Sequence, residues 1–510
     1  MNIRCIVLVL FSFAACTANA QSTTPTFIAD SLENYITKGM SDWNIPGLAI
    51  AIVKDGKTVV MKGFGVKDIA TKEPVDENTL FQIASNSKLF TGTALAQLEY
   101  NNKLSLDDKV SKYIKGYELY DKNSTELVTI RDLLSHRIGT KTFQTDFVYW
   151  NSSLSRSAIV NRMRLMRPVG QFRQNYGYCN SCFVTAGEVI PIVSGKPWEV
   201  YVYDSILMPL QMTNTYTLSQ GISERTNVAK PYTNGYTGQL TQLPYDNIDN
   251  LGAAASIVSN VKDLSHWLLM QLDSGRYMGK RIMPWDVLQK TRVINTITRS
   301  SKHPLFPIHI QGYGLGVFTA DYSGRQIYFH TGGADGFVTN TCFVPEESLG
   351  ITILTNNDNQ HFFEALRYQI LDAYLGVPYQ NRSEEFLPGF AKDFAESIQH
   401  TKALQARVKG KRPPMDLESY TGVYNNELYG NIEIEKDAIG KGLHINFKGH
   451  NKLDATVQYM DNDEWLLTYN NLSYGIFAVK FVLSKNKVGS IDIRVNEFID
   501  YDAYTFTKKD

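Results

Sequence analysis

The chain has 510 residues, 43% of them hydrophobic and 20% charged, so it can bury a large core and is neither disordered nor fibrous. Its 51 basic and 51 acidic residues balance, which excludes the basic surface that nucleic-acid binding requires. The mean hydropathy is −0.23 and no long apolar run follows the first twenty residues, so we expect no transmembrane segment in the mature chain. The length favours more than one domain.

Residues 1–20 have the features of a secretory signal peptide. Arg4 precedes an apolar run over 6–11, and small residues at 18–20 offer a cleavage site. An alternative is that Cys16 becomes a lipidated N-terminal cysteine. Both interpretations predict export, to the periplasm or, with Cys16 lipidated, to the outer membrane as a lipoprotein.

Helices and strands follow one another in a simple order along the first three quarters of the chain. A helix is expected over 27–35, then a β-hairpin with strands at 48–53 and 58–60. A buried helix begins at or just after Ser85. Further helices are indicated over 131–135, 183–193 and 261–272, and strands over 312–320, 326–330, 338–344 and 350–355. Because helices lie between an N-terminal hairpin and C-terminal strands, we expect an α+β fold whose antiparallel sheet is closed by both ends of the chain.

The last quarter of the chain differs in character. Residues 380–414 are polar and charged and are interpreted as a linker. After them, five short strand-like runs alternate with Gly, Asn, Asp and Lys turns, which is typical of a small barrel or a sandwich. We therefore predict a signal peptide at 1–20, a first domain at 21–379, a linker at 380–414 and an all-β domain at 415–510.

One Ser-x-x-Lys pair stands out as a candidate for nucleophilic catalysis. This spacing places a hydroxyl and an amine one helical turn apart, where a desolvated lysine can take the serine proton. The pattern occurs at Ser85, Ser259 and Ser484. Ser259 is explained as a helix cap and Ser484 as part of a charged turn. Only Ser85, with Lys88, opens a buried helix, where backbone N–H groups favour a developing anion.

Two further short motifs follow in the sequence. Tyr178-Cys179-Asn180 lies in a glycine-containing loop that leads into a helix. His330-Thr331-Gly332, followed by Gly333, lies between two predicted strands, where glycines let a substrate approach the backbone and offer an N–H to an oxyanion.

In this order the motifs resemble those of the class C β-lactamase-like serine hydrolases, a group that includes esterases, D-aminopeptidases and carboxypeptidases. The segments that carry the resemblance are 81–88, 130–137, 178–180, 312–316 and 330–333, and they span most of residues 27–376. The resemblance implies a β-lactamase/transpeptidase-like fold, which is an antiparallel sheet flanked by helices together with an all-helical subdomain. The tail is similar to the lipocalin-like β-domain often appended to such hydrolases.

The resemblance also implies roles for individual residues. Ser85 would be the acylated nucleophile, Lys88 and Tyr178 would share the general base and acid roles, and Asn180 would bind the substrate amide and orient Lys88. The backbone N–H groups of Ser85 and Gly333 would form the oxyanion hole. His330, Thr331 and Gly332 would complete the substrate-binding strand.

Two expectations concern charge at this site. Lys88 and Tyr178 have no acidic partner in their motifs, so burial and mutual positive charge should lower the lysine pKa and favour the tyrosine phenolate. His330 stands where β-lactamases have lysine. A mostly neutral histidine should recognise a substrate carboxylate weakly and favour short esters, amides or D-amino-acid peptides over penicillins. An alternative is that Arg137 or another cation supplies the missing charge.

Other residues receive structural interpretations. His136 and Arg137 are expected to hold a helix end. Cys179 and Cys182 have a redox or metal spacing, but no second ligand pair accompanies them, and three cysteines in the mature chain are no disulfide scaffold. No metal and no cofactor are predicted.

The sequence therefore predicts an exported serine hydrolase that acts through an acyl-enzyme on a small-molecule or peptide substrate, without a nucleic-acid partner. The alternatives are a β-lactamase and a non-turnover, penicillin-binding-like sensor. The all-β tail is expected to dock near the active-site mouth or to mediate self-association. The oligomeric state is not legible in the sequence.

Overall fold

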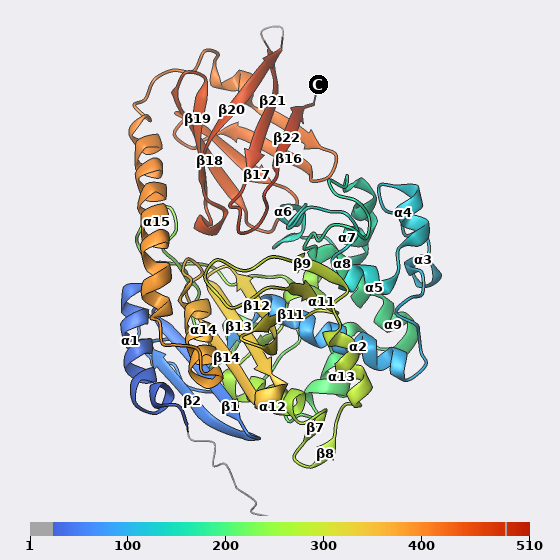
Figure 1. Cartoon of the computed structure of the whole chain (residues 1–510). Helices are drawn as coiled ribbons and strands as arrows, with labels where there is room; N and C mark the ends of the chain where they lie inside the picture. The colour runs from blue at the N-terminus through green and yellow to red at the C-terminus, as the bar shows by residue number, and fades with distance from the viewer. Residues whose placement is uncertain (1–23, 485–486, 510) are drawn as a thin grey trace, which may run out of the picture.

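The computed structural model describes residues 24–484 and 487–509. A larger body of sheet and helices carries a smaller β-barrel, formed by the end of the chain, on one side (Figure 1). The signal-peptide and Cys16 predictions lie outside the described residues. Among the described helices, none combines the length and apolar character needed to cross a bilayer.

The larger body is organised around one antiparallel sheet of eight strands, in the order β2-β1-β14-β13-β12-β11-β10-β9. The first hairpin pairs with the last strand of the body, so both ends of this region close the sheet, as predicted. The strands are β1 (Gly47–Lys54), β2 (Lys57–Gly65), β9 (Thr296–Arg299), β10 (Gln311–Tyr313), β11 (Phe318–Tyr322), β12 (Arg325–Ala334), β13 (Phe337–Val344) and β14 (Leu349–Thr355).

Strand β1 is apolar and buried over residues 47–53 because helices cover both faces of the sheet. Leu48, Ile50 and Ile52 pack with helices α1 (Leu32–Asp42) and α14 (Phe362–Leu375). Ala49 and Ala51 face the core that holds helices α2 (Ser87–Tyr100) and α12 (Val261–Leu272). A strand buried on both faces needs an unbroken apolar run rather than an alternating one. The sheet thus separates the two layers of helices.

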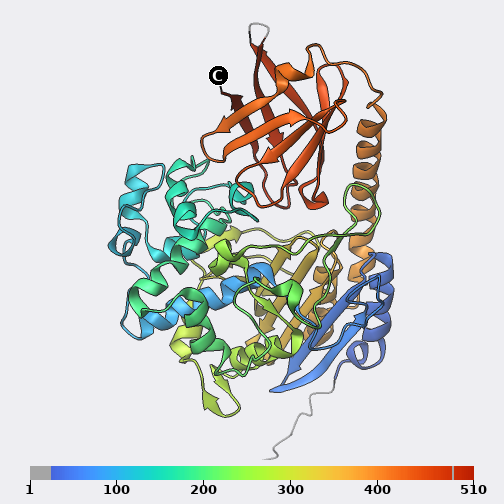
Figure 2. The same ribbon diagram turned by 180° about the vertical axis from the view of Figure 1, so that it is seen from behind.

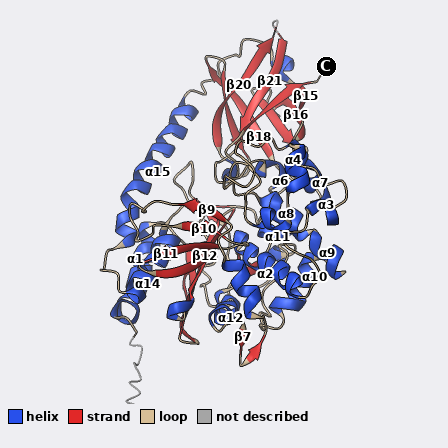
Figure 3. Cartoon of the chain, turned by 45° about the vertical axis from the view of Figure 1, so that its right-hand side comes forward, coloured by secondary structure: helices blue, strands red, loops and turns tan. Residues whose placement is uncertain are grey.

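The remaining helices form an all-helical region beside the sheet (Figure 3). Helix α1, expected over 27–35, runs to Asp42, and the helix expected over 183–193 starts earlier and divides into α8 and α9. The helices of the body are α1 (Leu32–Asp42), α2 (Ser87–Tyr100), α3 (Val110–Tyr113), α4 (Lys122–Leu127), α5 (Ile130–Leu134), α6 (Asp146–Tyr149), α7 (Arg156–Arg162), α8 (Asn180–Gly187), α9 (Val189–Ser194), α10 (Trp198–Val202), α11 (Gly252–Ala255), α12 (Val261–Leu272), α13 (Trp285–Arg292) and α14 (Phe362–Leu375).

Two strand predictions are corrected by the structure. The single strand expected over 312–320 is two strands, β10 and β11, because Gly316 turns the chain with φ +83° where it passes the backbone of Lys88. Strand β12 does not stop at His330 but continues to Ala334. The glycine motif therefore lies in a strand rather than in the loop after it.

The cap of α12 is also corrected. Ser259 lies in the short strand β6 (Val258–Ser259), and its hydroxyl contacts Thr215. The side chain that caps α12 is Asn260, which accepts the backbone N–H of Asp263 at 2.8 Å. The prediction for Ser259 was wrong by one residue.

Most of the segment interpreted as a linker is one long helix, α15 (Arg382–Ala406), which runs from the sheet to the barrel along one edge of the molecule (Figures 1 and 2). At its start Arg382 donates to Asp372 at 2.7 Å, and both side chains are buried. Near its end Leu404 packs with Met460 and Leu466 of the barrel. Contacts at both ends make this connection a strut.

The end of the chain forms a closed barrel, which settles the choice between barrel and sandwich. Alternate residues of its strands point inward, and both edges are paired because β15 meets β22. The strands are β15 (Gly422–Asn426), β16 (Gly430–Lys436), β17 (Leu443–Phe447), β18 (Asp454–Asp461), β19 (Glu464–Tyr469), β20 (Ile476–Ser484), β21 (Lys487–Arg494) and β22 (Ala503–Lys508).

The barrel packs firmly against the helical region. Phe147 of α6 lies between barrel rings, stacked on Tyr429 and His450 with centroids 5.1 and 5.2 Å away. Its backbone N–H donates to the buried carboxyl group of Asp500. The cores of the two bodies are therefore continuous at this point.

Candidate active site

Ser85 lies at a sharp turn between a short strand and a helix. Strand β3 (Phe81–Gln82) pairs with β6, and Ala84 then adopts φ +45°, a left-handed conformation unusual for alanine. A single helical turn over Ala84–Asn86 leads directly into α2. The turn presents Ser85 to a cavity while α2 continues into the core.

The Lys88 amine is fully buried and touches three oxygen atoms. Its Nζ lies 3.0 Å from Ser85 Oγ, 2.7 Å from Asn180 Oδ1 and 3.0 Å from the carbonyl of Ala254. Burial lowers the pKa of Lys88 to about 7. The carbonyl and amide oxygens only accept hydrogen bonds, so a neutral amine fills them with its two N–H groups and turns its lone pair to the Ser85 hydroxyl.

Asn180 connects the lysine to a buried acid that the sequence analysis missed. Its Nδ2 donates to Asp146 Oδ2 at 2.6 Å, which fixes the amide so that its oxygen faces Lys88. Burial raises the pKa of Asp146 well above its usual range, and the nearby Asp500 adds to the effect. Lys88 and Tyr178 have no acidic partner within their motifs, and the fold brings Asp146 to Lys88 from a distant segment through Asn180.

Tyr178 is a neutral phenol in this site. Its hydroxyl is buried without a hydrogen bond of normal geometry, and Ser85 is the polar side chain that interacts with it. Burial raises the pKa of Tyr178 far above its ordinary value, which outweighs the small lowering from Ser85. The phenolate expected from the sequence is therefore disfavoured.

His136 packs against the Tyr178 ring and hydrogen-bonds to the loop that carries it. Its ring lies 4.3 Å from the Tyr178 ring, and its Nδ1 accepts the backbone N–H of Cys179 at 3.0 Å. Burial lowers the pKa of His136 well below its usual range, so the ring is neutral. This arrangement agrees with a structural role.

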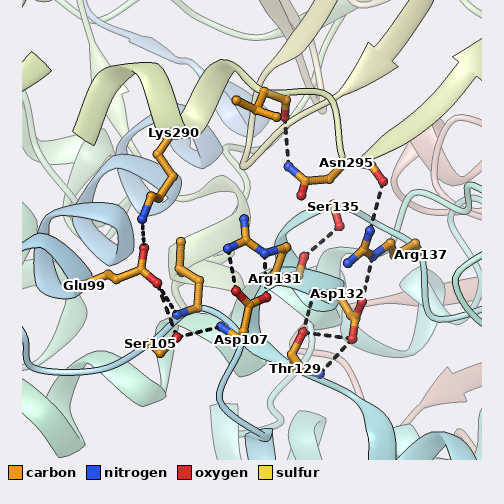
Figure 4. Close-up of polar contacts among 12 residues, drawn as sticks. Glu99, Ser105, Asp107, Thr129, Arg131, Asp132, Ser135, Arg137, Lys290 and Asn295 are labelled. Atoms are coloured by element: carbon orange, nitrogen blue, oxygen red, sulfur yellow. Dashed lines mark hydrogen bonds and ion pairs between the residues drawn. The ribbon is translucent and has the colours of Figure 1, made fainter. Parts of the chain in front are cut away.

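Arg137 does not supply a charge to the cavity, because its guanidinium is used elsewhere. It donates to Asp132 at 2.7 Å and to the Asn295 carbonyl at 3.0 Å (Figure 4). In the same network Thr129 and Asp132 form a capping box for α5. The network holds the helix end that positions His136.

His330 is buried on β12 and is neutral. Its Nδ1 lies 2.6 Å from the Thr331 carbonyl, which can only accept, so Nδ1 carries the proton and Nε2 accepts from the Tyr313 hydroxyl at 2.9 Å. Burial, followed by the proximity of Lys88, lowers the pKa of His330 to about 3.

The glycines of the third motif allow two close approaches. A side chain at Gly332 would meet the Ile83 carbonyl at 2.1 Å, so this strand lies directly against the Ser85 turn. A side chain at Gly333 would meet the ring of Phe498 at 2.5 Å. The same strand thus touches the candidate nucleophile on one side and the barrel on the other.

These side chains surround one cavity of about 390 Å³. Every site residue expected from the sequence except Lys88 lines it, and Lys88 lies beneath Ser85. Most of the other lining side chains are aromatic, and no lysine or arginine of the described chain lines the cavity. The lining residues are Ser85, Thr142, Phe143, Asp146, Trp150, Tyr176, Tyr178, Asn180, Phe318, His330, Thr331, Gly332, Gly333, Val338, Phe363, Phe498, Ile499 and Tyr501.

The barrel supplies one wall of this cavity through Phe498, Ile499 and Tyr501. Tyr501 stacks on Phe143 at 5.7 Å, and Lys141 pairs with Asp502 at 2.8 Å. The tail thus docks at the mouth of the site, the first of the two arrangements expected from the sequence.

Some lining residues lacked any local signal in the sequence. Asp146 and Phe498 belong to no motif, and only the packing of distant segments brings them to Ser85. Tyr313 could have been found, because it lies in the Gly-Tyr-Gly segment that contributes to the family resemblance.

No group of three or more His, Cys, Asp or Glu side chains within the described residues is placed to hold a metal ion. Cys179 and Cys182 are buried free thiols.

The chain is similar to several known proteins. Two relatives are Unguisins hydrolase ungD of Aspergillus violaceofuscus, 24% identical over 84% of this chain and 80% of that protein, and Protein flp of Staphylococcus aureus strain MW2, 25% identical over 67% and 66%. The octameric penicillin-binding protein homologue from Pyrococcus abyssi shares the fold, with a TM-score of 0.60 and 23% identity over 94% of this chain and 99% of that chain.

Family models cover both bodies. A domain of unknown function, DUF3471, matches residues 406–508, which contain the barrel. The model described as Beta-lactamase matches residues 32–375, which contain the sheet, the helical region and the Ser85 site. The chain therefore belongs to the beta-lactamase family, a family of serine hydrolase-like proteins.

Proposed function

We propose that this protein is an exported serine hydrolase that cleaves esters or amides through an acyl-enzyme on Ser85. The observation that carries the proposal is the buried Lys88 amine, 3.0 Å from Ser85 Oγ, with its pKa lowered to about 7 by burial. A buried amine of this pKa is a base near neutral pH.

In this mechanism Lys88 Nζ takes the Ser85 proton as Oγ bonds to the substrate carbonyl carbon. The oxygen of the tetrahedral intermediate is held by the backbone N–H groups of Ser85 and Gly333, where one donor is typically worth about 2.7–4 kcal/mol. Tyr178, a neutral phenol, gives its proton to the leaving group and regains one from the Lys88 ammonium. A water molecule then hydrolyses the ester on Ser85 with the same groups acting in reverse.

The cavity supports a substrate with an uncharged, apolar acyl group. Its walls are mainly aromatic, and no cation of the described chain lines them to bind a carboxylate. The low pKa of His330 keeps that ring uncharged at neutral pH. We therefore propose short esters, amides or D-amino-acid peptides as substrates rather than penicillins.

Export is proposed from residues 1–20, whose charged start, apolar centre and small-residue end favour a signal peptide. The alternative form of this proposal is export as an outer-membrane lipoprotein with a lipid on Cys16.

A serine-directed fluorophosphonate should label the wild type once, at Ser85. Ser85→Ala should take up no label, whereas Ser259→Ala, which removes the serine of another Ser-x-x-Lys pair, should be labelled like the wild type. Intact-mass measurement reads out both. Equal labelling of Ser85→Ala would disprove the assignment, and product release that stops at one equivalent would show a non-turnover binding protein instead.

The acidic limb of the pH profile of kcat/KM should follow the titration of the Lys88 amine. Because only the neutral amine accepts the serine proton, activity should rise with pH through about 7 and then level off. Lys88→Arg should lose about 10²–10⁴-fold in kcat/KM, since arginine stays charged. A full rate profile with a p-nitrophenyl ester tests this. If the pH profile of Lys88→Arg had the same acidic midpoint and the same maximal kcat/KM as the wild type, another group would be the base.

His330→Lys should move specificity towards substrates with a carboxylate. A panel of p-nitrophenyl esters, D-alanyl and L-alanyl amides, a D-Ala-D-Ala peptide and a chromogenic cephalosporin gives the ratio of kcat/KM values. The wild type should prefer the esters and amides, and the substitution should narrow that preference. Efficient cephalosporin turnover by the wild type, unchanged in the variant, contradicts the argument.

Phe498→Ala should enlarge the cavity from the barrel side. For bulky acyl esters relative to acetyl esters, kcat/KM should rise by about tenfold, the order expected for an altered apolar pocket. Val482→Ala is the matched control, because Val482 is an exposed barrel residue that does not line the cavity. An unchanged ratio in Phe498→Ala would mean that the barrel does not limit substrate size.

A further inference from the structure

Two aspartates that the proposed mechanism does not use are buried together between the larger body and the barrel. Asp335 lies in the turn between β12 and β13, two residues beyond Gly333, and is 0% exposed. Asp246 is 2% exposed, and its Oδ2 accepts the backbone N–H of Asp335 at 2.8 Å. These two side chains are called the carboxyl pair below. Within the described chain, neither of them forms an ion pair with a lysine or an arginine.

The two members of the carboxyl pair differ in their hydrogen bonds. Both oxygens of Asp246 accept, because Oδ1 also receives the side-chain N–H groups of Trp150 at 3.2 Å and Asn151 at 2.5 Å. In Asp335, Oδ2 accepts two bonds from the barrel, whereas Oδ1 is buried without a partner. A buried anionic oxygen with no donor is strongly unfavourable, and a neutral hydroxyl in the same place costs less. These contacts favour a proton on Asp335 Oδ1.

The barrel residues that bind Asp335 also hold the loop over residues 496–499, which carries Phe498. Asn471 Nδ2 and Ser473 Oγ donate to Asp335 Oδ2 at 3.0 and 2.6 Å. The Ser473 carbonyl accepts from Asn496 Nδ2 at 3.1 Å, and Asn496 Oδ1 accepts the backbone N–H of Phe498 at 3.2 Å. Hydrogen bonds therefore connect Asp335 to Phe498, the barrel ring that lines the active-site cavity.

We propose that Asp335 is a positioning residue for substrate size. In this proposal the carboxyl pair holds one proton, which keeps the Phe498 loop in the cavity wall. Loss of that proton to solvent at alkaline pH frees the loop and admits larger acyl groups, and no bond between heavy atoms changes. The effect on substrate size rests on the proposed function, whereas the release of the loop does not.

The direction of the pH effect follows from the burial of the carboxyl pair. Two ionised carboxyl groups in one buried site repel each other strongly and have no water to solvate them. Burial raises the pKa of both aspartates, and charge on Asp335 raises that of Asp246 further. Binding of the loop therefore weakens as the pH rises from the pKa of an exposed carboxyl group to that of the buried one.

Within the described chain, two further titratable side chains face the carboxyl pair. Asp358 Oδ2 accepts the backbone N–H of Gly336, the residue after Asp335, at 2.8 Å, and burial raises the pKa of Asp358 to about 7. Tyr474 lies on the barrel side, and burial raises its pKa, so its hydroxyl stays neutral. Because an ionised Asp358 opposes ionisation of the pair, Asp358→Asn should move the loop release to lower pH without abolishing it.

The kinetic test measures the ratio of kcat/KM for a bulky acyl ester to that for an acetyl ester, from neutral to alkaline pH, with the full-length protein. The ratio removes the pH dependence of the base, which both esters share. In the wild type it should rise at alkaline pH towards the value of Phe498→Ala, by up to about tenfold. Asp335→Asn keeps an acceptor oxygen for the barrel donors and does not ionise, so its ratio should stay low at every pH. Ser473→Ala should show a raised ratio already at neutral pH, whereas Ser490→Ala, which alters a barrel serine that does not line the cavity, should follow the wild type.

Backbone hydrogen exchange of residues 496–499 separates the outcomes without a substrate. Wild type and Asp335→Asn are compared at the same pH, so that intrinsic exchange rates cancel, and the wild type should exchange faster only at alkaline pH. Equal exchange at every pH, or the same alkaline increase in Asp335→Asn, overturns the role of the carboxyl pair. Faster exchange with an unchanged wild-type size ratio overturns the effect on specificity. Absence of any turnover, with the loop released as expected, counts against the proposed function and leaves Asp335 as the residue that holds the loop.

Discussion

The burial of one lysine amine is the constraint on which the site depends. An unpaired ammonium in a protein interior costs several kcal/mol, so Lys88 must meet acceptors from the elements around it. It finds them on the Ser85 turn, on the first residue of α8 and on the carbonyl of Ala254 in α11. Three segments far apart in the sequence therefore have to meet at one atom.

The fold also keeps the two histidines beside this amine uncharged. His136 and His330 are buried and neutral, and burial raises the pKa of Asp146 well above its usual range. In a medium of low dielectric, each full charge near Lys88 would change its pKa strongly. Desolvation is the largest influence on the pKa of Lys88 and lowers it to about 7, against the smaller opposing effects of Asp146, Cys179 and Cys182.

Residues of the larger body and of the barrel both line the cavity, and the long helix α15 connects the two bodies. Helix α15 fixes the distance between sheet and barrel through Arg382 at one end and Leu404 at the other. The barrel side chain Phe498 can then rest on β12 only because Gly333 has no side chain. A glycine in the sheet and a ring in the barrel thus form one complementary contact, and the wall of the cavity depends on it.

Local patterns in the sequence were enough to determine several features. Ser85 and Lys88 lie one turn apart in the same helix, the apolar run at 48–53 needs a sheet covered on both faces, and the turn rhythm of the tail needs an all-β domain. In each case the relevant contacts are between near neighbours, or follow from the period of a single element.

Only the tertiary structure decided the rest, because those contacts join residues that share no local pattern. Asp146 meets Asn180, Tyr313 meets His330, and Phe498 reaches Gly333 only when whole elements pack together. The same holds for protonation. Packing removes water from both Lys88 and Tyr178, which lowers the pKa of the lysine and raises that of the tyrosine, and the sequence alone does not specify how completely a side chain is buried.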